Sequence, residues 1–112
     1  MKTGIELIAE ERQRQIEIEG WTPEHDDQYT DGQLAEAASC YAAFANSISV
    51  GPDEIAIFRG SVSYDFFAGI TRDHRWPWDD MWWKPSPNDR IRELQKAGAL
   101  IAAEIDRLNR IQ

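Results

Sequence analysis

The chain has 112 residues and a formal net charge of −8 at pH 7, and 42% of its residues are hydrophobic. This length allows one domain with one core, expected to span residues 1–112, and the composition is globular. The excess of acidic residues argues against binding to duplex DNA or RNA, because a phosphate backbone requires concentrated Lys and Arg. No apolar run reaches the ~18 residues of a membrane span, no signal peptide is visible, and the lone Cys40 cannot form an internal disulfide. We therefore expect a cytoplasmic protein without a membrane partner.

The first predicted helix begins with a capping box, in which the Thr3 hydroxyl accepts from the Glu6 amide and the Glu6 side chain reaches back. It runs to Gly20, a natural C-terminal stop. The expected buried stripe contains Ile5, Ile8, Ala9 and Ile16. Arg12 interrupts this stripe where an apolar residue is expected.

A polar loop over residues 21–32 follows, and Trp21 and Tyr29 are expected to pin it to the core. A second capping box, Thr30 with Gln33, predicts a helix that starts at residue 31 or 32. Its apolar positions recur three and four residues apart: Leu34, Ala37, Ala38, Tyr41 and Ala45. The alanines predict close approach to a neighbouring helix, and Cys40 among them should be a buried thiol.

Residues 48–75 favour an irregular excursion that holds at most a short β-hairpin. Apolar and polar residues alternate over 62–66, after the apolar run 55–58, which suits a hairpin. Pro52, followed by two acidic residues, suits a short helix start equally well.

The last predicted helix is the clearest element. Ser86 supplies an N-cap, Pro87 the first helical position, and Asp89 a favourable charge in the first turn. Apolar positions then alternate three and four apart, as in the seam of a bundle: Ile91, Leu94, Gly98, Ile101, Ile105 and Leu108. Because residues 97–103 carry no charge, this should be the central helix. The predicted fold is mainly α: a compact bundle of three main helices, with an irregular Trp-rich segment draped over one end.

Carboxylates on two helices form the first candidate site. Glu10 and Glu11 on the first helix and Glu104 on the last could hold Mg²⁺, because hard cations take carboxylate oxygens and bundle cores can gather them. The same residues also fit a solvated acidic face with helix-stabilising pairs such as Glu10 to Arg14.

Residues 24–27 place His25 beside three acidic residues. A neighbouring carboxylate can fix the imidazole tautomer or share a metal, although the chain has no earlier His to complete a phosphohydrolase-type metal site. Turn chemistry explains the same residues if Asp26 and Asp27 bond local amides or cap the next helix.

The least ordinary feature is the tract 76–85, WPWDDMWWKP, with four tryptophans, the last three of them between two prolines: Trp76, Trp78, Trp82 and Trp83. Their indole rings could stack a nucleobase or anchor a partner protein, with Lys84 at the edge of that face. They could equally be the lid of a core that three helices alone cannot close.

The segments EERQRQIEIEGW, EHDDQYTDGQLAEAASCYA, WPWDDMWWKP and KAGALIAAEIDRL together resemble a family of small bacteriophage and prophage proteins, with residues 46–74 unmatched. The resemblance implies a bacterial host cell and no mechanism. A more distant similarity is to MazG-like all-α nucleoside triphosphate pyrophosphohydrolases, which implies a helical bundle and Mg²⁺-dependent hydrolysis. The chain departs from that pattern, because Arg14 stands where the Glu-Glu-x-x-Glu motif ends and Asp106 follows Glu104 at a different spacing.

Three functional hypotheses follow. The leading one is a phage accessory protein, with a counter-defence role open, that binds a nucleotide or nucleotide-derived signal. It would stack the base on the tryptophans and place phosphates near Arg12, Arg14, Arg75 or Lys84. The second is a Mg²⁺-dependent pyrophosphohydrolase that uses Glu10, Glu11 and Glu104. The third is an acidic protein that binds and inhibits a host factor, and homo-oligomerisation is also open.

Overall fold

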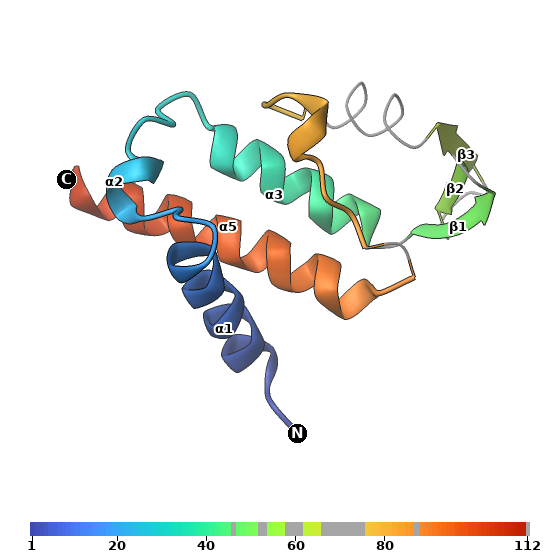
Figure 1. Ribbon diagram of the computed structural model, residues 1–112, viewed down its shortest axis with the longest axis horizontal. Coiled ribbons are helices and arrows are strands. Elements are labelled where there is room, and N and C mark those ends of the chain that lie inside the picture. The colour runs from blue at the N-terminus through green and yellow to red at the C-terminus, as the bar shows by residue number, and fades with distance from the viewer. Residues whose placement is uncertain (46, 52–53, 58–61, 66–75, 87, 112) are drawn as a thin grey trace.

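The computed structural model describes residues 1–45, 47–51, 54–57, 62–65, 76–86 and 88–111, and the protein is mainly α-helical. Within these ranges the α-helices are α1 (Gly4–Glu17), α2 (Pro23–Asp26), α3 (Gln33–Phe44) and α5 (Arg90–Arg110), and a 3₁₀ helix, η1, spans Asp80–Trp82. Figure 1 shows α5 lying between α3 on one side and α1 on the other, so the last helix is the central one, as predicted. No helix among these described ranges is both long and apolar enough to cross a membrane.

The predicted capping box of α1 is confirmed. Thr3 Oγ1 accepts from the Glu6 amide at 3.2 Å, and Glu6 Oε1 accepts from the Thr3 amide at 2.9 Å. The predicted buried stripe is wrong in part, because Ile5 is 82% exposed and Ala9 is also exposed. The buried residues of α1 are instead Glu11 and Gln15. The contact of this helix with the rest of the molecule therefore combines buried polar groups with partly buried apolar side chains such as Ile8.

Helix α3 packs closely against α5 through its small residues, as the alanines predicted. Ala37 and Cys40 are both fully buried, and burial raises the pKa of the Cys40 thiol to about 11. The start of the helix differs from the prediction. Gly32, in the left-handed region at φ 82°, is the N-cap, and the Gln33 side chain accepts from the Asp31 amide. The second capping box is therefore not formed.

The predicted seam of α5 is wrong as a buried face. Its large side chains are 41–63% exposed: Ile91, Leu94, Ile101, Ile105 and Leu108. The buried apolar positions are Ala97, Ala99, Leu100 and Ala103. Small residues on this second face let the alanines of α3 approach, which large side chains would prevent. The helix begins at Arg90, and Asp89 is its N-cap, accepting from the Arg92 amide at 3.0 Å.

Gly98 of α5 lies directly against the Ile8 side chain of α1. A Cβ atom at this position would lie 2.5 Å from Ile8 Cδ1 and 2.7 Å from Ile8 Cγ1. We expect Gly98→Ala to lower the free energy of unfolding by about 1–2 kcal/mol, since overpacking outweighs the better helix propensity of alanine. In an Ile8→Ala background the same change should instead stabilise by up to about 1 kcal/mol. Urea denaturation of the wild type, Gly98→Ala, Ile8→Ala and the double variant gives the change in free energy of unfolding in each background. The same sign of change in both backgrounds would contradict this packing.

Three short strands form an antiparallel sheet in the order β1 (Ser47–Gly51), β2 (Glu54–Ile57) and β3 (Val62–Asp65). The pairing of β2 with β3 confirms the hairpin, in the register Ile55 with Tyr64 and Ile57 with Val62. Strand β1 was not predicted. Part of the predicted excursion, residues 66–75 with Arg75, lies outside the described residues.

Candidate functional site

The tryptophan tract divides into an inward half and an outward half. Trp76 and Trp83 are buried, 9% and 3% exposed, and their rings lie against Tyr41 with centroids 5.7 and 4.7 Å away. These two indoles belong to the core. Trp82 is 53% exposed and Trp78 is partly buried, and both line a cavity. Trp76 lines the same cavity, so the tract both closes the core and forms one wall of the cavity.

Hydrogen bonds to α3 and α5 hold Lys84 and Ser86, the residue after the tract. The Lys84 amide donates to the Tyr41 hydroxyl at 3.2 Å. Burial of this hydroxyl raises the pKa of Tyr41 to about 12. Glu93 on α5 accepts from the Ser86 amide, and Lys96 Nζ donates to the Ser86 hydroxyl at 2.9 Å. Burial raises the pKa of Glu93 and lowers that of Lys96. The cavity wall formed by the tract is therefore held at its C-terminal end.

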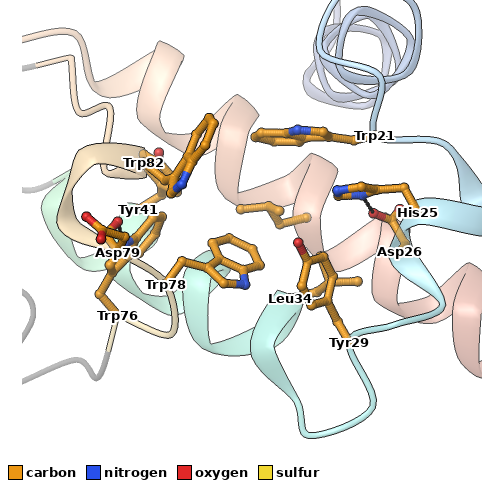
Figure 2. Close-up of a pocket in the computed structure, with 11 residues that line it drawn as sticks. Trp21, His25, Asp26, Tyr29, Leu34, Tyr41, Trp76, Trp78, Asp79 and Trp82 are labelled. Atoms are coloured by element: carbon orange, nitrogen blue, oxygen red, sulfur yellow. Dashed lines mark hydrogen bonds and ion pairs between the residues drawn. The ribbon is translucent and has the colours of Figure 1, made fainter.

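The cavity has a volume of about 310 Å³ and lies between the loop around α2, helices α3 and α5, and the tract. Figure 2 shows Trp21 and Trp82 on one side of this space and Trp78 and Tyr29 on the other, with His25 at one end. The ring centroids of Tyr29 and Trp78 are 5.1 Å apart. Aromatic side chains from segments more than 40 residues apart in the sequence thus converge on one space.

A chain of polar and charged side chains lies at the His25 end of the cavity. His25 Nδ1 lies 3.2 Å from Asp26 Oδ1, and Arg12 Nη2 donates to Asp26 Oδ2 at 2.7 Å. Arg12 Nη1 also donates to the Trp21 carbonyl at 3.1 Å, which fixes the backbone that carries this indole. The Asp26 carboxylate favours the tautomer protonated at Nδ1, and Nε2 of His25 is then an acceptor at the cavity. Tyr29, beside the same carboxylate, has its pKa raised by burial and by that charge.

Of the residues predicted to bind a ligand, three line the cavity: Trp76, Trp78 and Trp82. Trp83 is in the core, and Lys84 is exposed and does not line the cavity. Arg12 is only 12% exposed and holds Asp26. Arg14 holds Glu11 through two hydrogen bonds, at 2.8 and 3.0 Å, and also pairs with Glu19. The guanidinium groups of both arginines are therefore paired with carboxylates of the protein and are not presented to a phosphate.

The positions of Trp21, His25 and Tyr29 at the cavity were not predicted. Trp21 and Tyr29 were predicted as loop anchors, and His25 with Asp26 either as a metal-binding or tautomer-fixing pair or as turn residues. The available signal was the density of aromatic residues and the His-Asp pair in one short loop, but nothing in that loop indicated that it faces the distant tract.

The predicted Mg²⁺ ligands are not brought together. Glu10 pairs with Lys2 at 2.8 Å, Glu11 with Arg92 at 2.6 Å, and Glu104 with Arg107 at 2.6 Å. Within the described ranges, no three His, Cys, Asp or Glu side chains gather as metal ligands. Each carboxylate has a cationic side chain as its partner instead. The arrangement therefore gives no support to the magnesium cluster that the pyrophosphohydrolase hypothesis requires.

Glu11 is the most buried of these carboxylates, at 3% exposure. Burial by itself would raise the pKa of Glu11, but hydrogen bonds from Arg14 and Arg92 outweigh it and hold the pKa below its usual value. Because Arg92 belongs to α5, Glu11 joins α1 to the central helix.

Comparison with protein-family models, with curated proteins and with solved structures found no match to this chain. The case for a function therefore depends on the geometry of the aromatic cavity.

Proposed function

We propose that the protein binds the base of a nucleotide or nucleotide-derived ligand in the aromatic cavity. The observation that carries the proposal is the convergence of Trp21, Trp78, Trp82 and Tyr29 around one space of about 310 Å³. Ligand pockets are typically about 300–1,000 Å³ and mostly apolar, with a few polar groups that orient the ligand. A cavity at the lower end of this range suits a single base, whose stacking on aromatic rings contributes about 1–3 kcal/mol.

Polar groups at the cavity supply partners for the edge of a base. His25 Nε2 accepts in the favoured tautomer, and the exposed Asp79 carboxylate is a second acceptor. Trp78 Nε1 is buried and has no hydrogen-bond partner within the described part of the chain. An unsatisfied buried donor costs about 1–3 kcal/mol, so a ligand acceptor that reaches it would recover this energy.

The phosphates of such a ligand would extend beyond the cavity. Arg12 and Arg14 are held by carboxylates of the protein, which leaves Lys84 as the exposed cation on the tract. The affinity should therefore come mainly from the base. In the phage setting that the sequence resemblance implies, sequestering a nucleotide signal of the host would be a counter-defence function.

We expect Trp82→Ala to weaken binding of a base-containing ligand about 10-fold or more, because it removes one stacking wall. Trp82 is 53% exposed, so the fold should survive the change. Met81→Ala is the matched control, since Met81 is 64% exposed on the neighbouring position and does not line the cavity. A panel of nucleosides, nucleotides and cyclic dinucleotides is screened by thermal shift, and hits are measured by calorimetry. If no member of the panel stabilises the protein, the proposal fails.

A further inference from the structure

The charges at the aromatic cavity are those of a site for a positive group. Within the described part of the chain, the cavity lining contains two carboxylates, Asp26 and Asp79, and no lysine or arginine. Arg12 is paired with Asp26, and Lys84 does not line the cavity. The chain as a whole has a net charge of −8. The electrostatic potential in the cavity should therefore favour a ligand whose bound part is positive.

Asp79 is the carboxylate of the cavity that a ligand can reach. It is exposed, its Oδ1 accepts from the Met81 amide at 3.0 Å, and it forms no ion pair with a described lysine or arginine. Asp26 differs, because Arg12 donates to one of its oxygens at 2.7 Å and His25 lies 3.2 Å from the other. Figure 2 shows Asp79 at the end of the cavity opposite His25. The second oxygen of Asp79 is therefore available to a cation.

The His25 end of the cavity is also rich in electrons. The pKa of Tyr29 is raised by burial and by the charge of Asp26, so this carboxylate affects the cavity although Arg12 pairs with it. In the tautomer that Asp26 favours, His25 has the lone pair of Nε2 at the cavity. Both ends of the cavity thus carry groups that attract positive charge.

The walls of the cavity add the faces of aromatic rings. Trp21 and Trp82 lie on one side, and Trp78 and Tyr29 on the other (Figure 2). The face of an aromatic ring is negative, and it attracts a cation within about 6 Å of the ring centroid. Indole gives the strongest attraction among the side chains, and the attraction increases when the cation leaves water. A neutral base stacks on the same rings without this attraction of a full charge.

We propose that the base preferred by the cavity is cationic, a purine that carries a positive charge because one of its ring nitrogens is alkylated. This inference rests on the proposed function and specifies which base the ligand contains. The cationic ring would stack between the indoles, with the Asp79 carboxylate at its edge. Its charge is delocalised, as in a guanidinium group, so it is hydrated more weakly than a compact ammonium and loses less on entering the cavity.

Two isomeric nucleosides separate the effect of charge from the effect of size. The base of 1-methyladenosine is positive at neutral pH, whereas N6-methyladenosine carries the same added methyl group and is neutral. Calorimetry on the wild type should show that 1-methyladenosine binds about 10-fold or more tightly than its isomer. The cationic base of 7-methylguanosine should likewise bind more tightly than that of guanosine.

The outcomes of this comparison distinguish the preference for a cation from the proposed function. Equal affinity of the two isomers, or tighter binding of the neutral one, overturns the preference and leaves base binding in place. If none of the four nucleosides binds, both the inference and the proposed function fail for this class of ligand.

Asp79→Asn tests the carboxylate. The asparagine keeps an oxygen that accepts from the Met81 amide, so the substitution removes the charge and retains this contact. The ratio of the two isomers' affinities should fall about 3-fold or more. Asp106→Asn is the matched control, because it removes the same charge from an exposed position on α5 that does not line the cavity, and it should leave the ratio unchanged. A ratio that Asp79→Asn leaves unchanged, or that both substitutions lower equally, overturns the role of Asp79 as the partner of the cation.

Discussion

Glu11→Ala should lower the free energy of unfolding by about 2–3 kcal/mol, because it leaves Arg14 and Arg92 without the carboxylate that pairs them. Removing one member of a buried ion pair typically costs about 3–5 kcal/mol. The value here should be smaller, since the side chains of Arg14 and Arg92 are 38% and 28% exposed and water can solvate them. Urea denaturation at neutral pH measures the change.

The neighbouring carboxylate provides the control. Glu10 is exposed and pairs only with Lys2, so Glu10→Ala should cost less than about 1 kcal/mol. The two substitutions also separate a structural role for Glu11 from a metal site. If added Mg²⁺ stabilises the wild type and either substitution removes that effect, the two carboxylates act together on a cation and the ion-pair account is wrong.

The pH dependence should follow from the depressed pKa of Glu11. A carboxyl whose pKa is lower in the folded than in the unfolded state stabilises the fold above its unfolded pKa, about 4.3, and this contribution is lost as the pH falls through the folded value. The stability difference between the wild type and Glu11→Ala should therefore be full at neutral pH and shrink below about pH 4.

The three main helices could be predicted from local chemistry, and so could the buried face of α3, but the buried faces of α1 and α5 could not. The Thr3 capping box set the start of α1, and an uncharged run marked α5 as the central helix. Helix α5 carries two apolar faces, one of alanines and one of large aliphatic residues such as Ile105. Periodicity favours the larger side chains as the core. It cannot indicate which of the two faces the other helices of the chain will cover.

The candidate site was predictable only on one side. The aromatic density of the tract indicated Trp78 and Trp82, whereas Trp21 lies more than 50 residues away in the sequence and faces them only in the folded chain. Arginines near an aromatic surface suggest phosphate binding, but in the folded chain they can form ion pairs with carboxylates instead. Arg12 stands in the predicted apolar stripe of the first helix, and this was the sequence sign of such a pairing. Its side chain forms a buried ion pair with Asp26.

We expect the largest loss of stability from Asp26→Ala, about 3–5 kcal/mol, because Asp26 is 2% exposed and its partner Arg12 is only 12% exposed. The substitution leaves the Arg12 guanidinium buried without its carboxylate, and Arg12 Nε already has no partner within the described part of the chain. Thermal and urea denaturation both measure this loss. Asp27→Ala is the control, since the Asp27 side chain is 51% exposed and the surface pair with Arg110 should contribute less than about 1 kcal/mol.

The same substitution should also disturb the cavity, which distinguishes Asp26 from a purely structural residue. Asp26 orients His25, and Arg12 joins Asp26 to the Trp21 backbone, so the stacking wall and the acceptor at the cavity depend on one carboxylate. Asp26→Asn keeps the shape and removes the charge, so we expect it to weaken ligand binding while the protein remains folded at low temperature. If Asp26→Asn binds the ligand as tightly as the wild type, the chain from Arg12 through Asp26 to His25 stabilises the fold alone. The base would then be held only by the aromatic rings.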